Sequence, residues 1–156
     1  MNVKRFALMG GTLMLVLGLL ALFPGFSRDP ARAGLPALVL DMSYGQFVGL
    51  IPMNILNKLA LILFGMLGIL SATSVTGSLP NSIRFSRLVF FAMAPLAILG
   101  VIPATQTLRG YWPLFGGDVA LHAIFAALGA YFGFTTTGRV TSKQEEEIES
   151  GMRRAA

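Results

Sequence analysis

The chain has 156 residues, a formal net charge of +5 and no cysteine, which excludes disulfides, thiolate metal sites and cysteine nucleophiles. Hydrophobic residues make up 54% of it and charged residues only 12%, against roughly 25% charged residues in a soluble domain. The length suits one small bundle without a second domain. Because most basic residues flank apolar runs, the charge favours a role in membrane topology and disfavours nucleic acid as a partner.

Four apolar runs predict an all-α fold, a four-helix transmembrane bundle in the lipid bilayer. They cover residues 6–23, 55–75, 88–102 and 119–134, and each is bounded by proline, glycine or charge. A helix needs roughly 20 apolar residues to cross the hydrocarbon core, and interfacial residues complete shorter runs. We therefore expect residues 1–134 to form a four-span domain and residues 135–156 to form a polar cytoplasmic tail.

The first run also has the features of a signal peptide: Lys4 and Arg5 come before it, and the small-residue site Ala31-Arg32-Ala33 follows. The apolar stretch is long for the hydrophobic region of such a peptide, and the small-residue site lies well beyond its end. A membrane span is therefore the favoured interpretation, and a cleaved signal peptide is the alternative.

The distribution of basic residues predicts how the chain lies in the membrane. Eight fall on one side of the predicted spans: Lys4, Arg5, Arg84, Arg87, Arg139, Lys143, Arg153 and Arg154. Four fall on the other side, several of them close to an aspartate: Arg28, Arg32, Lys58 and Arg109. Basic residues favour the cytoplasmic side. We expect a multi-pass protein of the inner or plasma membrane, or of the thylakoid, with both termini cytoplasmic.

The two loops on the far side of the membrane differ in length. The first, about residues 24–52, is long enough to contain an element of its own, and Leu35 to Leu40 suggest a short segment lying at the membrane interface. In the second loop, Tyr111 and Trp112 are typical of aromatic anchors at the headgroup level.

The two halves of the chain resemble each other. Superposing Asn54 on Asp118 also places Lys58 on His122 and Gly65 on Gly129. This correspondence predicts two tandem helical hairpins inserted in the same sense, an arrangement known from other membrane proteins. The alternative is that any two membrane hairpins share proline and glycine at their turns.

The polar tail carries its own signal. Ser142 and Glu145 have the spacing of a capping box, which predicts a short cytoplasmic helix over about residues 143–152. A helix of this length is marginal in water, so we expect it to be stable only when docked.

The candidate site lies at the outward ends of the second and fourth spans. Asn54, Asn57 and Lys58 share one helix face, and Asp118 and His122 share another. Ionisable groups at membrane depth are often functional, but residues near the interface also serve as structural pairs. The cluster is therefore either a polar clamp or a site for a ligand or ion.

Small residues continue both faces inward. Gly65 and Gly68 follow on the second span, and Gly129 and Gly133 follow on the fourth. Glycine lets helix backbones approach closely in a membrane. We expect these two faces to pack on each other, which would bring Lys58 near Asp118 and His122 beside both asparagines.

His122 is the only histidine in the chain. One imidazole suffices to ligate a haem or chlorophyll, although a bis-histidine haem within one chain is excluded. The sequence has no zinc-ligand spacing, phosphate loop, Ser-His-Asp set or carboxylate pair. We therefore expect no enzyme activity and no metal centre, and no cofactor is required by the sequence.

Two segments resemble a known family. They are Pro52-Met53-Asn54-Ile55-Leu56-Asn57 running to Gly65, and Gly117-Asp118 through Leu121-His122 to Gly133. The family is a small four-span membrane family of bacteria, cyanobacteria among them, known as domain of unknown function 4383. The resemblance covers about residues 6–134 and implies the span layout without an activity.

Family members typically carry histidines on the second span, where this chain has Asn57 and Leu61, and they share His122. The departure argues against a metal or haem site that would use histidines of both helices.

The leading functional hypothesis is a non-enzymatic accessory or assembly subunit of a larger membrane complex, with other membrane protein subunits as partners. The cyanobacterial members of the family suggest a photosynthetic host, and a respiratory host is the other candidate. One alternative is a small transporter or ion pathway using Lys58, Asp118 and His122. Another is a membrane protein that binds a pigment, haem or quinone at His122.

Overall fold

The computed structural model describes residues 2–135, which form four helices arranged as two hairpins. Helix α1 (Val3–Ala21) packs along α2 (Ile55–Thr73), and α3 (Ser78–Val101) packs along α4 (Gly117–Ala130). A π-helical turn (Tyr131–Thr135) extends α4. All four helices, α4 with its extension, are long and apolar enough to cross a membrane. The predicted all-α, four-helix fold is confirmed, and the expected helix over residues 143–152 lies outside the described residues.

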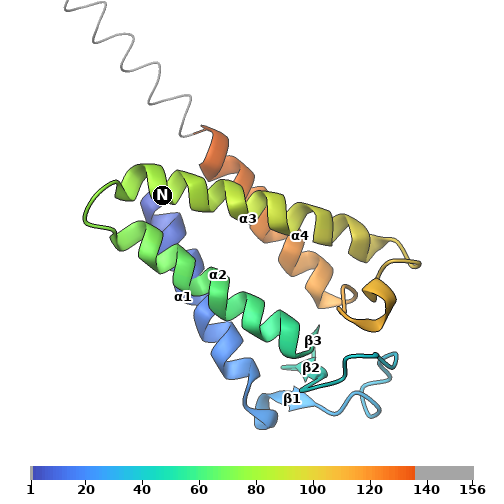
Figure 1. The fold of residues 1–156 in the computed structure, drawn as a ribbon. Helices are drawn as coiled ribbons and strands as arrows, with labels where there is room; N and C mark the ends of the chain where they lie inside the picture. Colours follow the sequence, from blue (N-terminus) through green and yellow to red (C-terminus); the bar gives the residue numbers. More distant parts are fainter. Residues whose placement is uncertain (1, 136–156) are drawn as a thin grey trace, which may run out of the picture.

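The two hairpins diverge from one end of the molecule to the other. They lie closest where α2 passes into α3 and spread toward the opposite end, which the loops occupy (Figure 1). Near the closed end, the rings of Phe6 in α1 and Phe132 after α4 stack at 4.8 Å between centroids. Buried side chains of all four helices, including Met14, Phe85 and Phe125, form the main hydrophobic core.

Local caps explain where α1 and α2 begin. The side chain of Asn2 accepts a hydrogen bond from the backbone N–H of Arg5 at 2.9 Å. Asn54 and Asn57 form a reciprocal capping box at the start of α2. Such caps satisfy backbone N–H groups that have no partner within the helix. Both helices therefore begin at residues that the local sequence favours.

Helix α3 begins at Ser78, well before the apolar run that starts at Leu88. Apolarity marks only the part of a helix suited to hydrocarbon, so the preceding polar turns were missed. Pro80 is compatible with this start because residues of the first turn need no intrahelical N–H donor. The hydroxyls of Ser82 and Ser86 donate to carbonyls one turn earlier, at 2.7 Å and 2.8 Å, which satisfies them inside the bundle.

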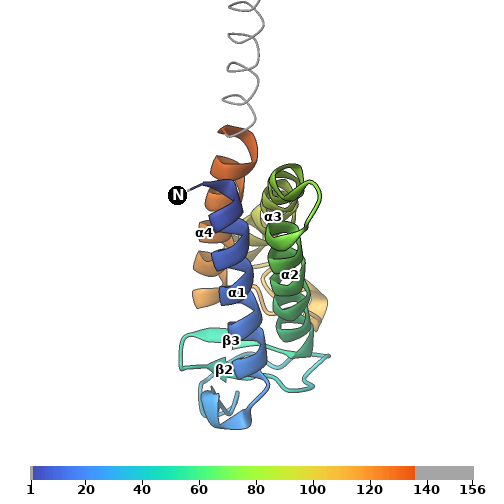
Figure 2. The same cartoon turned by 90° about the vertical axis from the view of Figure 1, so that its left-hand side faces the viewer.

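The first loop contains a small antiparallel sheet that was not predicted. Its strands are β1 (Ser27–Arg28), β2 (Gly45–Phe47) and β3 (Ile51–Met53), in that order. The segment Leu35 to Leu40, expected to be an extra element, has neither helix nor strand. Strands this short leave no readable alternation in the sequence. The sheet lies at the loop end of the bundle, away from the N-terminus (Figure 2).

Each predicted packing glycine lies in a close contact with the other helix of its own hairpin, and Gly68 also faces Phe85 of α3. A Cβ on Gly65 would lie 2.5 Å from the backbone N of Leu15 in α1, and one on Gly68 would lie 2.8 Å from the carbonyl of Ala7. On α4, a Cβ on Gly129 would lie 2.7 Å from the carbonyl of Ser86 in α3.

Gly133 lies equally close to α3, since a Cβ there would be 2.9 Å from Cγ of Arg87. The expectation that the second and fourth spans pack on each other through these glycines is therefore wrong. The physical reason is that α1 has small residues of its own, Gly11 and Gly18, which fit against α2.

Candidate functional site

The five polar residues expected to form one cluster are all buried, with exposed fractions between 0% and 6%. They do not form a single cluster. They separate into a capping residue that joins the two loops, a lysine beneath the sheet, and a group of three around a cavity. The five residues are Asn54, Asn57, Lys58, Asp118 and His122.

Asn54 joins the two loops. Its Nδ2 donates to the carbonyls of Leu40 at 3.1 Å and Tyr111 at 2.8 Å, one in each loop. Its Oδ1 accepts from backbone N–H groups in the first turn of α2. Both donors of the amide are thus used, as are its acceptor sites. Asn54 is a structural residue with no hydrogen-bonding capacity left for a ligand.

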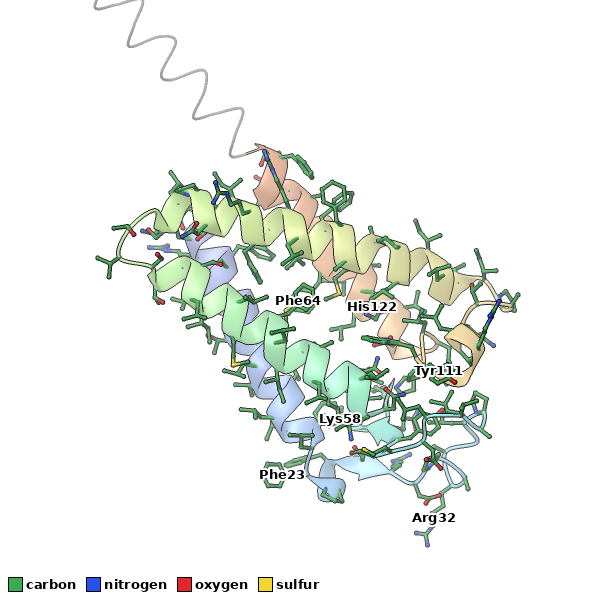
Figure 3. The ribbon with its side chains drawn as sticks, in the orientation of Figure 1. Phe23, Arg32, Lys58, Phe64, Tyr111 and His122 are labelled. Atoms are coloured by element: carbon green, nitrogen blue, oxygen red, sulfur yellow. The ribbon has the colours of Figure 1, made fainter. Side chains whose placement is uncertain are left out.

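Lys58 lies beneath the sheet, at the loop end of α2 (Figure 3). Its Nζ donates to the carbonyl of Ser43 at 2.6 Å and to the hydroxyl of the same residue at 2.7 Å. Within residues 2–135 the lysine forms no ion pair with a carboxylate. The expected proximity of Lys58 to Asp118 is therefore wrong, because the first loop folds over the start of α2 and Ser43 reaches the ammonium group.

Asp118 and His122 lie one turn apart on α4. Nδ1 of the imidazole is 3.1 Å from Oδ2 of the carboxylate, and both side chains are buried. Asp118 belongs to the first turn of the helix, where the helix dipole favours a negative charge. The two atoms are close but not aligned as a hydrogen bond within the described residues. A proton on Nδ1 would leave Nε2 of a neutral imidazole as an acceptor.

A cavity of about 50 Å³ adjoins this pair, between α2, α3 and α4. Asn57, Trp112, Asp118 and His122 form its polar part. The rest of the lining is apolar: Ala60, Leu61, Phe64, Ala92, Met93, Leu96, Leu121 and Phe125. Phe64 and His122 lie on facing helices of the two hairpins (Figure 3). The expected approach of His122 to the asparagines therefore holds for Asn57 alone.

The cavity has room for a few water molecules. Besides the unaligned contact between Asp118 and His122, three polar groups remain available in it. Asn57 uses its Oδ1 to accept from the backbone N–H of Asn54 at 3.2 Å, which leaves its Nδ2. Nε1 of Trp112 is buried and has no hydrogen-bond partner within residues 2–135. In the same part of the chain, Nε2 of His122 also has no hydrogen bond.

Trp112 was not predicted to belong to this site. The residue is half-buried, with its indole nitrogen inside the bundle. A tryptophan near a predicted span end is normally interpreted as an interfacial anchor. No signal in the sequence shows whether the indole lies at the membrane interface or inside the bundle, because this depends on how the second loop folds back toward α4.

The arrangement can hold a proton and bind a small polar group, but it contains no nucleophile with an adjacent base. Within the described residues no group of three or more His, Cys, Asp or Glu side chains is placed to hold a metal ion. The three available groups are hydrogen-bonding groups, which suit the cavity to a small polar group.

Comparison with known proteins identifies the family. Residues 4–135 match the family described as a domain of unknown function (DUF4383), and the chain belongs to that family. No curated protein matches the chain. No solved structure matches it.

Proposed function

We propose that this member of the DUF4383 family is a non-enzymatic, multi-pass membrane protein that serves as an accessory or assembly subunit of a larger membrane complex. The observation that carries the proposal is the outer face of α4. Ala120, Ala123 and Ala127 are exposed there at helical spacing. Ile124 and Leu128 are exposed beside this row of alanines, whereas exposed positions of the other helices carry large side chains such as Met9, Leu63 and Phe91.

This difference matters because lipid supplies no hydrophobic force between helices. Helices associate in a bilayer through close van der Waals packing, which small residues permit. Ala123 and Ala127 have the four-residue spacing of such contacts. The chain already uses small residues in this way inside both hairpins, at Gly65 and Gly129. The outer face of α4 is therefore suited to a helix of another subunit.

The test is native electrophoresis of protein extracted from its own membranes in a mild detergent. The wild type is expected to migrate with partners at high mass, and an Ala123→Leu, Ala127→Leu double variant as the free protein. Thr12→Leu is the control because it adds bulk at an exposed position of α1. Mass spectrometry identifies the partners, with respiratory and photosynthetic complexes as the first candidates. A wild type that migrates only as a monomer refutes the proposal.

We place both termini in the cytoplasm, with the sheet on the opposite side of a plasma, inner or thylakoid membrane. Lys4, Arg5, Arg84 and Arg87 support this orientation. They belong to the first halves of α1 and α3, and these helices begin at the end of the bundle that holds both described termini (Figure 2). The acidic residues of the described chain lie toward the other end: Asp29, Asp41 and Asp118. Basic residues favour the cytoplasmic side.

The absence of cysteine allows a direct test of this orientation. Single cysteines introduced as Ala37→Cys in the first loop and Thr76→Cys between α2 and α3 occupy exposed positions at opposite ends. A membrane-impermeant maleimide is expected to label the first in intact cells and the second only after lysis. The reverse pattern contradicts the orientation.

The cavity beside His122 favours a second function, binding the polar head of a lipophilic molecule such as a quinone. Its apolar walls and the unpaired Nε1 of Trp112 suit a carbonyl oxygen. The ion-pathway alternative has less support, since Lys58 contacts Ser43 and not the Asp118–His122 pair. An absorption spectrum of the protein purified from native membranes, with His122→Phe as control, tests for a bound chromophore.

A further inference from the structure

Lys58 is a buried cation without a counter-ion. Its side chain is 2% exposed, and its ammonium group donates two hydrogen bonds, both to Ser43. An ammonium group has three donors, so one N–H remains. Within residues 2–135 no carboxylate forms an ion pair with it. Buried charges are normally paired because removing them from water is costly, so the missing partner calls for an explanation.

A second unpaired group lies beside this lysine. Oγ of Ser27, in β1, is buried and has no hydrogen-bond partner within the described residues. Ser27 and Lys58 line the same pocket, which has a volume of about 290 Å³. The pocket lies where the first loop folds across the start of α2. Its other lining residues are Pro24, Arg28, Asp29, Pro30, Ser43 and Tyr44.

Two other polar side chains of the pocket, Asp29 and Tyr44, are engaged elsewhere. Asp29 accepts hydrogen bonds from the backbone N–H groups of Ala31 and Arg32, at 3.0 Å and 3.2 Å, so its carboxylate belongs to a local turn. The hydroxyl of Tyr44 donates to the carbonyl of Pro36 at 3.1 Å. The polar groups left without partners among the described residues of this pocket are thus an ammonium N–H of Lys58, the hydroxyl of Ser27 and the guanidinium of Arg28, all able to donate.

We propose that this pocket binds a phosphoryl group, with Lys58 supplying the charge and Ser27 a second hydrogen bond. An anion with several acceptor oxygens satisfies both donors at once, and hydrogen bonds between charged groups are the strong ones. The pocket lies at the end of a helix long enough to span the bilayer. The phosphoryl group therefore belongs either to the headgroup of an anionic phospholipid or to free phosphate.

The test compares three variants of the full chain, purified in detergent. Lys58→Met removes the charge, and Ser27→Ala removes the unpaired hydroxyl. Arg32→Gln is the control, because it removes one positive charge from the same loop at a residue that points away from the bundle (Figure 3). Inorganic phosphate is titrated against the thermal melting of detergent-solubilised protein. Retention of phosphatidylglycerol against phosphatidylcholine is measured by native mass spectrometry from nanodiscs containing both lipids.

We expect Lys58→Met to weaken binding about tenfold and Ser27→Ala about threefold, as loss of a charged and of a neutral hydrogen bond implies. Arg32→Gln is expected to change the binding affinity by less than about twofold, because an exposed charge contributes little to binding. Stabilisation by phosphate identifies the free anion as ligand, and selective retention of phosphatidylglycerol identifies the lipid. Either result supports the site.

Two outcomes overturn the proposal. One is that neither phosphate nor phosphatidylglycerol binds the wild type. The other is that Arg32→Gln weakens binding as much as the two pocket variants, which would indicate diffuse surface charge. If Lys58→Met does not fold, Ser27→Ala decides the question, since the hydroxyl it removes has no partner in the described protein.

Discussion

The starts of α2 and α4 occupy equivalent positions in the two hairpins, yet their polar residues behave differently. Asn54 and Lys58 of α2 direct their side chains into the loops, to the carbonyls of Leu40, Tyr111 and Ser43. At the matching positions of α4, Asp118 and His122 pair with each other and line an internal cavity.

The difference comes from the loops. The chain between α1 and α2 is long, forms a sheet and folds across the start of α2, so its carbonyls supply partners there. The shorter connection between α3 and α4 supplies none to the side chains of Asp118 or His122 within the described residues. Corresponding positions at the starts of α2 and α4 therefore acquire different roles according to the loop that covers them.

The largest expected effect is at Asn54. Asn54→Ala removes four hydrogen bonds, two of which join the loops, so we expect it to lower the free energy of unfolding by about 4 kcal/mol. Asn2→Ala is the matched control: that cap forms one side-chain bond, to Arg5, and its loss should cost about 1 kcal/mol. Chemical unfolding in mixed micelles measures both. Equal losses would show that Asn54 acts only as a cap.

The next comparison concerns the matching residues His122 and Lys58. His122→Leu leaves the buried carboxylate of Asp118 unpaired, so we expect a loss of about 3 kcal/mol in the same assay. In Lys58→Met every carboxylate keeps the partner it has in the wild type, because Lys58 forms no ion pair within the described residues. We therefore expect the free energy of unfolding to change by no more than about 1 kcal/mol. If both variants lose the same stability, the distinction drawn between the two helix starts fails.

Where the hairpins are alike, the same substitution should have the same effect in both. Gly65→Ala and Gly129→Ala each force a methyl group against the backbone of the neighbouring helix, which should cost about 2 kcal/mol. Gly25→Ala is the control, because nothing lies within 4 Å of its added Cβ. Thermal melting in detergent measures all three. A loss in only one hairpin would show that the other can move apart.

The smallest expected effect is a pH dependence in the loop that covers α2. Burial raises the pKa of Tyr44 above its ordinary value, so the fold favours the protonated hydroxyl. An unfolded tyrosine has a pKa of about 10. Below that pH the contribution of Tyr44 to the stability of the fold is fully present, and it is lost as the pH rises through the higher pKa of the folded state. Hydrogen exchange in the first loop should therefore quicken at alkaline pH, and less so in Tyr44→Phe. An identical pH profile in the variant contradicts this.

Local chemistry made the helices predictable from sequence. The apolar runs determine which segments are long enough to span a bilayer. The start of α2 is set by a capping box between Asn54 and Asn57, which lie close together in the sequence. The start of α3 was missed, because the turns from Ser78 to Arg87 are polar and form part of a helix whose apolar run begins only at Leu88.

The sequence by itself therefore determined the four apolar helices and the residues with polar or small side chains that would be buried. Only the tertiary structure decided their partners: Gly65 meets Leu15, Lys58 meets Ser43, and the indole nitrogen of Trp112 lies inside the bundle. Hydrophobic length and capping depend on neighbouring residues and can be read along the chain. Partners across helices and loops depend on how the long first loop folds, which no local pattern encodes.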